Sequence, residues 1–382
     1  MSKALVVAAD VPFPVVSGGR KRMVRLLEAM ERAGARPHLL VADGTAGDGN
    51  DPDLSRRGWS VESFPRSLSV RARLQMHARG WATPPSPALE RRLGELLDSA
   101  SFVQFEEVDV AQYAPLAARQ GVPTLVSLHN VDSQVRHDGQ SLRERYRRRR
   151  MADVERRAAR DADALLCVSG HDYEYFEAHG ARRPVLVPNG VDDDFFALPD
   201  TPPATQRVFF FGQFAWPPNA DGMRRFAEEG WGLVRETCPD AELRIAGPGS
   251  ADALGDLARI PGVEVLGFVD DLIAELAQTR AVVVPVWSGG GTRIKVLEAL
   301  AAARPVAGTP VGIERLGFEH GVHGLVAESP QELAQAVVTL IRDDATAAGC
   351  ARAGRELAGR YRWSSVTRPA EELYARLLYS SS

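Results

Sequence analysis

The chain has 382 residues, 45% hydrophobic and 25% charged, which is enough material for two domains that each bury a core. A formal net charge of -4 at pH 7 gives no overall attraction to nucleic acid or to an anionic membrane, so any anion site must be local. The widely separated Cys167, Cys238 and Cys350 indicate neither a disulfide framework nor a zinc site. With a short apolar start that ends at Asp10 and no run long enough to span a membrane, these features predict a cytoplasmic protein.

Short apolar runs alternate with longer amphipathic stretches along the chain, a pattern typical of parallel strands joined by crossover helices. In the first half we expect strands at residues 4–8, 38–41, 102–105, 124–128 and 164–168. In the second half we expect them at residues 208–211, 243–246, 263–266 and 281–284. The pattern therefore predicts two α/β domains, followed over residues 330–378 by two or three helices.

Residues 187–203 combine turn dipeptides, three consecutive Asp and several prolines, so we place the interdomain linker there. This gives a Rossmann-like first domain over residues 1–190 and a second over 200–362. Residues 363–382 form a terminal helix that could pack back on the first domain.

A glycine-rich loop follows the last of these strands, in the segment PVWSGGGT of residues 285–292. Thr292 is a good N-cap for a helix that runs to about Ala302. Glycines let the backbone approach a ligand, and the free amides at a helix start suit a phosphate, although a plain flexible turn is the alternative.

Charged residues in this helix favour the ligand-binding interpretation. Arg293 and Lys295 fall in the first turn, where the helix dipole disfavours a cation by roughly 0.3–1 kcal/mol. A nucleotide diphosphate would offset that penalty; the alternative is a solvated pair of surface cations. Glu298 shares a face with the apolar Ile294, Leu297 and Ala301, and ribose hydroxyls would satisfy its carboxylate, although an exposed Glu chosen for helix propensity is also open.

The first half offers a second group of polar residues. Gly18 and Gly19 follow Ser17 at a helix start, and His129 ends a strand at the sheet edge where open α/β folds bind ligands. His129 could orient a sugar or stabilise charge, or be purely structural. Glu106 also ends a strand, and it could face an acceptor or cap a turn.

Several segments together resemble glycosyltransferase family 4, the retaining enzymes of GT-B fold. They are PFPVVSGGRKRMVRLLEAMERAG, VSLHNVDSQ, DADALLCVSGHDYEYF, VPNGVDDDFF, VFFFGQFAWPPNADGMRRF and GGGTRIKVLEALAAARPVAGTPVG. The resemblance implies two facing Rossmann-like domains with a cleft between them, the donor nucleotide on the second and the acceptor on the first. It implies transfer, with retention, from a nucleotide sugar, UDP-sugar favoured, to a hydroxyl on a glycan, a lipid-linked molecule or a small molecule. No cofactor and no metal are required.

The resemblance also assigns roles to individual residues. Glu298 would bind the ribose, Arg293 and the backbone of Gly290, Gly291 and Thr292 would hold the diphosphate, and Gly18 and Gly19 would close on the donor. Gly212 begins the loop after the first strand of the second domain and joins the donor-binding set. We name Arg293, Lys295 and His129 as the catalytic residues.

Two departures from the family pattern stand out. Gly290 occupies the position eight residues before Glu298 where the family has a second acid, and the loop of residues 212–219 lacks the family's Arg and Lys. We expect Arg293 and Lys295 to substitute for those cations.

Two other functions stay open. One is a nucleotide-sugar-binding protein that has lost transfer, and the other is a nucleotide-sugar epimerase of the same architecture. A dehydrogenase is disfavoured because Asp252 stands where a dinucleotide fingerprint needs its third glycine.

One helix carries a local excess of positive charge. Residues 143–160 hold nine Arg against three acids. They could meet a membrane surface or an anionic acceptor, but a solvated helix face is favoured because the apolar face is poor for insertion. We expect no nucleic-acid partner.

Overall fold

The computed structural model describes residues 2–15, 17–42, 52–66, 69–79, 81–134, 141–290 and 293–380. The chain forms two compact units, which we call unit 1 (Met1–Pro188 with Thr367–Ser382) and unit 2 (Asn189–Val366). The last segment of the chain therefore belongs to the same unit as the first.

Unit 1 is built on a seven-stranded sheet with the order β3-β2-β1-β4-β5-β6-β7, in which all described pairs are parallel. Its strands are β1 (Ser2–Ala8), β2 (Ala35–Val41), β3 (Ser60–Ser63), β4 (Ala100–Glu106), β5 (Thr124–Ser127), β6 (Ala164–Cys167) and β7 (Pro184–Leu186). Successive residues of a strand point to opposite faces, so Leu5 and Val7 join one apolar cluster while Val6 and Ala8 join another. Burial on both faces explains why these strands read as continuous apolar runs.

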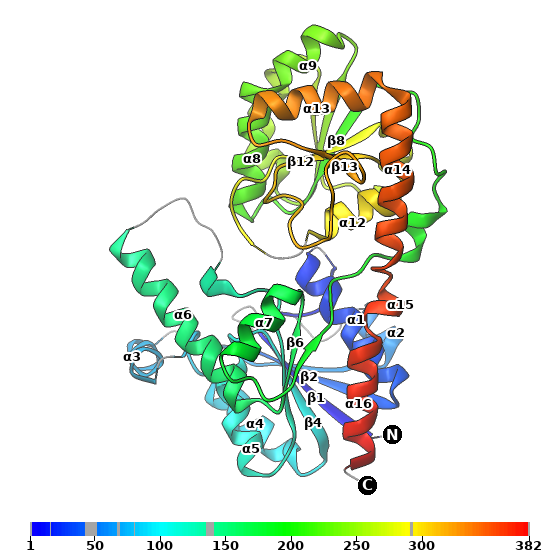
Figure 1. Cartoon of the computed structure of the whole chain (residues 1–382). Helices are drawn as coiled ribbons and strands as arrows, with labels where there is room; N and C mark the ends of the chain where they lie inside the picture. Colours follow the sequence, from blue (N-terminus) through cyan, green and yellow to red (C-terminus); the bar gives the residue numbers. More distant parts are fainter. Residues whose placement is uncertain are drawn as a thin grey trace. The chain divides into compact units, whose positions relative to one another are not determined.

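Helices lie on both faces of this sheet (Figure 1). They are α1 (Gly18–Arg32), α2 (Pro52–Arg57), α3 (Val70–Arg79), α4 (Pro87–Leu97), α5 (Ala114–Arg119), α6 (Leu142–Asp161), α7 (Gly170–Ala178) and α16 (Arg368–Ser380). The final helix, α16, runs along α1 and also contacts β4. There Tyr374 stacks on Phe102 with ring centroids 5.4 Å apart.

Unit 2 holds a six-stranded parallel sheet with the order β10-β9-β8-β11-β12-β13. Its strands are β8 (Arg207–Phe211), β9 (Glu242–Ala246), β10 (Val263–Gly267), β11 (Ala281–Val284), β12 (Val306–Gly308) and β13 (Gly324–Val326). Its helices are α8 (Pro217–Glu229), α9 (Trp231–Thr237), α10 (Ser250–Leu254), α11 (Leu272–Ala277), α12 (Ile294–Ala301), α13 (Pro330–Arg342), α14 (Asp344–Gly359) and α15 (Trp363–Val366).

Each sheet has one point at which the strand order reverses direction, between β1 and β4 in unit 1 and between β8 and β11 in unit 2. The loops that leave the carboxyl ends of such neighbours diverge to opposite faces and leave a crevice for a ligand. The fold therefore marks one candidate binding edge in each unit.

All nine strands expected from the sequence are present, so the prediction of two parallel α/β domains is confirmed. Four further strands, β3, β7, β12 and β13, were not expected from the sequence, because they have only three or four residues and carry weak apolar signals. The tail holds four helices rather than two or three, because the short α15 precedes α16.

Candidate active site

The glycine-rich loop after β11 and the loop after β8 meet at the switch point of unit 2, and Lys295 joins them. Its Nζ donates to Asn219 Oδ1 at 2.6 Å and lies 4.2 Å from the centre of the Phe210 ring. A Cβ atom placed on Gly212 would lie 2.7 Å from this amine. Gly212 therefore leaves the space that the ammonium occupies at the end of β8.

The electrostatic environment of Lys295 disfavours its charge. Burial lowers the pKa of Lys295 well below its usual value, and the positive charge of Arg293 lowers it further, while Glu298 acts in the opposite direction. One hydrogen bond and the face of an aromatic ring do not compensate the ammonium for the hydration that it loses on burial. An anion bound here would restore the charged form, so the position suits a phosphate.

Arg293 is buried, with an exposed fraction of 6%. Nη1 donates to the Gly290 carbonyl at 2.7 Å, Nε donates to the Val311 carbonyl at 3.3 Å, and the guanidinium lies 5.0 Å from the Trp216 ring. Nη2 is buried without a hydrogen-bond partner among the described residues. Arg293 thus braces the loop with two nitrogens, and its third is left without a partner in the part of the chain that the structure describes.

Burial lowers the pKa of Arg293 to about 10, with Glu314 acting against the shift and Arg315 adding to it. Arg293 keeps its charge at neutral pH, at the cost of desolvation. The same physical cause therefore acts on both cations of this corner.

The start of α12 corrects one prediction. Arg293, not Thr292, is the N-cap residue of α12, and its side chain makes no capping hydrogen bond. Lys295 lies in the first turn of α12, as expected, but Arg293 lies before that turn. The predicted ligand-binding residues Gly291 and Thr292 lie outside the described residues.

Glu298 is buried on α12, with an exposed fraction of 6%, so the alternative of an exposed Glu is wrong. It lies one turn after Lys295 on the same helix, and its negative charge supports the Lys295 ammonium. Unit 2 thus brings together Gly212, Gly290, Arg293, Lys295 and Glu298 at one end of its sheet.

In unit 1, His129 is held between two carboxylates. Its Nδ1 lies 2.6 Å from Glu107 Oε1, and its Nε2 lies 3.5 Å from Glu106 Oε2. In the parallel pair β4–β5, Glu106 lies opposite Ser127, so the carboxyl ends of both strands lie side by side. Glu106 is 2% exposed, and its Oε2 is directed at the histidine.

The two carboxylates decide the charge of His129. Burial on its own lowers the pKa of the ring, but the charges and hydrogen bonds of Glu107 and Glu106 outweigh it and raise the pKa to about 9. The imidazolium form therefore prevails at neutral pH. Burial, together with the charges of neighbouring acids, also raises the pKa of Asp132 to about 7.

The start of α1 packs directly against this histidine. Ser17 caps α1 by accepting from the Arg20 amide at 3.3 Å, as expected for a helix that begins at Gly18. A Cβ atom on Gly19 would lie 3.0 Å from His129 Nδ1. Gly19 is therefore required for close approach, and unit 1 brings together the predicted residues Gly18, Gly19 and His129.

Glu107 is the site residue that sequence reasoning missed. It adopts φ 71°, a left-handed conformation that is uncommon for a residue other than glycine. Strain of this kind concentrates at functional sites, but it cannot be read from residue types. The only available signal was a pair of acids directly after a buried strand.

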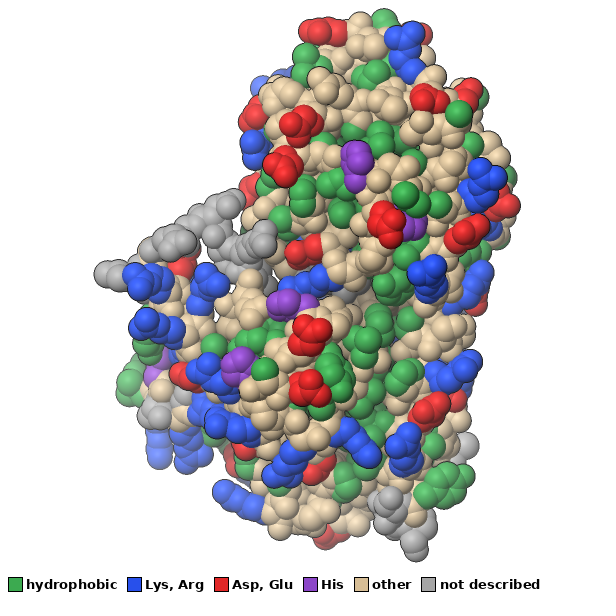
Figure 2. Space-filling model, in the orientation of Figure 1, with side chains coloured by type: hydrophobic (Ala, Val, Ile, Leu, Met, Phe, Trp, Pro, Cys, Tyr) green, Lys and Arg blue, Asp and Glu red, His purple; other side chains and the backbone are tan. Residues whose placement is uncertain are grey.

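The arginine-rich segment forms α6, and Lys and Arg side chains gather over this helix in Figure 2. Several of its arginines bind backbone carbonyls elsewhere in unit 1: Arg148 donates to Ser133, Arg150 to Met76 and Arg157 to Arg79. Part of the charge excess is therefore used to hold neighbouring segments. Among the described residues, no helix is both long enough and apolar enough to cross a membrane.

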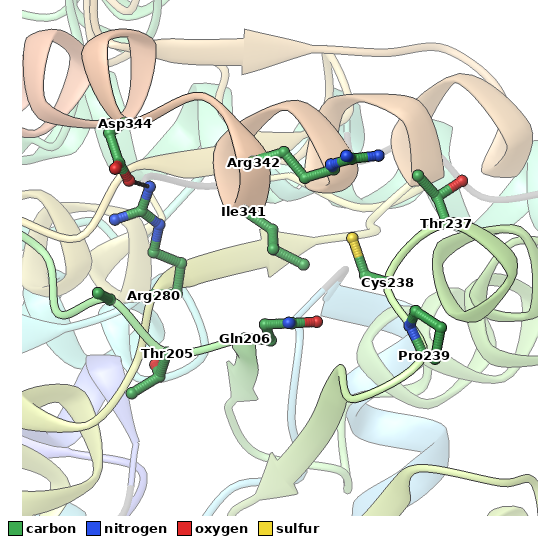
Figure 3. Close-up of a pocket in the computed structure, with 10 residues that line it drawn as sticks. Thr205, Gln206, Thr237, Cys238, Pro239, Arg280, Ile341, Arg342 and Asp344 are labelled. Atoms are coloured by element: carbon green, nitrogen blue, oxygen red, sulfur yellow. Dashed lines mark hydrogen bonds and ion pairs between the residues drawn. The ribbon is translucent and has the colours of Figure 1, made fainter.

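A hollow of about 340 Å³ in unit 2 is shown in Figure 3. It is lined by residues that directly precede β8 and β11, so it lies at the amino ends of these strands, whereas the candidate site lies at their carboxyl ends. Arg280, which precedes β11, crosses its wall and bonds Asp344 Oδ1 at 2.5 Å and the Leu340 carbonyl at 2.9 Å. Because its cation is already satisfied by these partners, we assign the hollow a structural role.

Comparison with known proteins agrees with this picture. Residues 16–195 match the family described as Glycosyltransferase Family 4, and residues 205–343 match Glycosyl transferases group 1. Phosphatidyl-myo-inositol mannosyltransferase of Mycobacterium leprae is 30% identical over 208 residues, which cover 52% of this chain and 55% of that protein. The chain thus spans about half the length of this curated relative.

Solved structures resemble the whole chain. Anabaena HepE in complex with UDP and glucose has a TM-score of 0.72 at 18% identity, covering 100% of both chains. Sucrose-phosphate synthase from Thermosynechococcus elongatus has a TM-score of 0.70 at 17% identity, again covering 100% of both. Fold and matches together define a glycosyltransferase of the GT-B fold.

The chain belongs to glycosyltransferase family 4, among the group 1 glycosyltransferases. The predictions of fold, family and enzyme class made from the sequence are therefore confirmed.

Proposed function

We propose that this enzyme transfers a sugar from a UDP-sugar to a hydroxyl acceptor, with retention of the anomeric configuration. The observation that carries the proposal is the desolvated Lys295 ammonium, held over Gly212 at the switch point of unit 2. A buried cation with one neutral partner is suited to a diphosphate. HepE, which has the same fold, was solved with UDP and with UDP-glucose.

In this proposal unit 2 binds the donor. Lys295 and the spare Nη2 of Arg293 bind the diphosphate, helped by the backbone of residues 290–292, while Glu298 accepts from the ribose hydroxyls. As the bond to the sugar breaks, the leaving diphosphate gains negative charge, and both cations stabilise it most at that moment. No cofactor or metal takes part.

Unit 1 binds the acceptor and supplies His129, with Gly18 and Gly19, to the sugar. Because its pKa is about 9 and both ring nitrogens face carboxylates, His129 acts as a fixed positive charge and not as a base. Glu106 and Glu107 are both directed at this ring, so neither is placed as a nucleophile. We therefore propose same-face attack, in which the acceptor hydroxyl passes its proton to the leaving phosphate.

The charge of His129 also argues against the epimerase alternative. An epimerase must remove a proton from sugar carbon, which requires a base with a pKa near the working pH. An imidazolium clamped between two carboxylates does not meet that requirement.

The acceptor carries its hydroxyl on a glycan, a lipid-linked molecule or a small molecule. The curated relative is named for transfer to phosphatidyl-myo-inositol, a lipid. We place the enzyme in the cytoplasm, which is supported by three buried cysteines that form no disulfide.

The test is a thermal-shift panel of UDP-glucose, UDP-N-acetylglucosamine, GDP-mannose and free UDP. At a hundredfold excess over its dissociation constant a donor should raise the melting temperature by about 5 °C. Arg293→Ala and Glu298→Ala should lose this shift. Arg235→Ala is the matched control, because Arg235 also donates to a backbone carbonyl, that of Ala241 at 3.0 Å, but lies on α9. If no nucleotide stabilises the wild type, or all variants respond alike, the donor site is wrong.

Turnover separates transfer from mere binding. Release of UDP in the presence of a mixture of acceptors, with the product anomer assigned by NMR, is expected for a retaining enzyme. Donor binding without UDP release would instead favour a protein that has lost transfer, for which Gly290 in place of the family acid would be the first suspect.

A further inference from the structure

Two buried hydrogen bonds and an ion pair connect the last helix of the protein to the candidate catalytic histidine. On β4, every second residue points to the same face of the strand, and this face holds Phe102, Gln104 and Glu106. Gln104 is fully buried. Gln104 Nε2 donates to Glu106 Oε1 at 2.5 Å, and the hydroxyl of Tyr374 on α16 donates to Gln104 Oε1 at 2.7 Å. The other oxygen of Glu106 faces His129 Nε2.

The direction of every bond in this chain is determined by its chemistry. An ionised carboxylate only accepts, so the amide nitrogen of Gln104 must face Glu106. The amide oxygen then faces Tyr374, which must donate. Burial and the nearby charge of Glu106 raise the pKa of Tyr374 well above its usual value, so its hydroxyl keeps the proton that it donates.

Two cations compete for Glu106. Arg22, fully buried on α1, and His129 both interact with its charge. A carboxylate that was free to rotate could turn from one to the other. Gln104 fastens one oxygen, which leaves the second directed at the imidazole.

We propose that Tyr374 and Gln104 are positioning residues for transfer: they hold Glu106 in the rotamer that orients and charges His129. The proposal rests on the proposed role of His129 at the donor sugar. It gives α16 a function beyond packing, because the active-site histidine is then oriented only when the last helix of the chain is in place.

Other titratable groups around the His129 ring also influence its pKa, so the variants must leave them in place. Those that face His129 or Glu106 are Glu107, Asp132, Arg22 and Tyr374; Asp109 and Arg66 face Glu107, Glu155 faces Asp132, and Asp172 faces Arg22. The variants below leave all of these unchanged except the Tyr374 hydroxyl itself.

The primary experiment is an NMR titration of His129 in the full-length protein, because it needs no transferase activity. Gln104→Leu removes the bond to Glu106 and should lower the pKa of His129 by about one pH unit, the size of a lost charge-assisted hydrogen bond. Tyr374→Phe keeps the ring that stacks on Phe102 and should lower it by a smaller amount in the same direction. If Gln104→Leu does not fold, the pKa of His129 in Tyr374→Phe alone tests the proposal.

Leu373→Ala is the matched control for packing. Leu373 is 4% exposed, lies next to Tyr374 on α16 and belongs to the same apolar cluster. Its truncation should lower the melting temperature without moving the pKa of His129. A pKa of His129 that is unchanged in Tyr374→Phe, or that falls equally in Leu373→Ala, would overturn the proposal.

The transfer assay then connects positioning to catalysis. In Tyr374→Phe we expect kcat to fall about threefold to tenfold with an unchanged KM for the donor, and the alkaline limb of the pH profile to move to lower pH. A shifted pKa of His129 with an unchanged kcat would overturn the positioning role. Because the titration is independent of turnover, a wild type without transfer would refute the proposed function and not the hydrogen-bonded chain.

Discussion

The ion pair between His129 and Glu107 predicts a pH-dependent contribution to stability. The pKa of His129 rises from 6.5 to about 9, a difference worth about 3 kcal/mol if the whole shift acts on folding. Both carboxylates contribute, and the Glu107 side chain is 42% exposed, so water screens part of its effect. For Glu107→Gln we therefore expect a loss of about 1–2 kcal/mol at pH 6.

The sign of the pH dependence follows from the direction of each shift. A histidine whose pKa is raised in the folded state contributes its full stability below pH 6.5 and loses that contribution as the pH rises to about 9. Pairing with His129 lowers the pKa of Glu107 although partial burial acts in the opposite direction, so this partner stays ionised above pH 4.5. The effect of the substitution should therefore be largest between pH 4.5 and 6.5 and vanish near pH 10.

The assay is urea unfolding of wild type and variant at pH 6 and at pH 10. Glu95→Gln is the matched control, because Glu95 pairs with Arg92 at 3.0 Å on the surface, where such pairs are worth about 0–1 kcal/mol. Arg92 stays charged over this range, so the control should show a small effect without pH dependence. An equal loss for Glu107→Gln at both pH values would refute the reasoning.

Three further outcomes test the rest of the structure. Lys295→Met should abolish stabilisation by UDP in a thermal-shift assay, yet raise the free energy of unfolding of the unliganded protein by about 1–2 kcal/mol at neutral pH. This gain should shrink towards pH 10.5, where the lysine of the unfolded wild type also loses its charge, and a destabilised variant would contradict the prediction. Gly19→Ala should lower kcat about tenfold, because the added methyl group forces the His129 ring to move, and unchanged kinetics would show that the ring position is unimportant. Arg280→Met should lower the free energy of unfolding by about 1–3 kcal/mol through the loss of its hydrogen bonds but leave the UDP response intact, so a weakened UDP response would connect the remote hollow to the site.

Much of the candidate site could be located from the sequence because both binding edges follow from chain order. Parallel strands are buried on both faces and therefore read as apolar runs, and the polar or glycine residues directly after those runs must lie at the carboxyl edge of a sheet. This reasoning placed Gly18, Gly19 and His129 at one such edge and Gly212 at the other. The separate expectation that Thr292 caps α12 was wrong, because the N-cap residue of this helix is Arg293.

The sequence alone predicted the two α/β domains, the family resemblance and the position of the donor loop, because each of these depends on local periodicity or on short motifs. Contacts between distant segments were decided only by the tertiary structure. Lys295 meets Asn219 across 76 positions of sequence, and Tyr374 meets Gln104 across 270. The charge of Lys295 depends on its burial, and the charge of His129 depends on burial and on carboxylates brought close by strand register; no local pattern encodes these quantities.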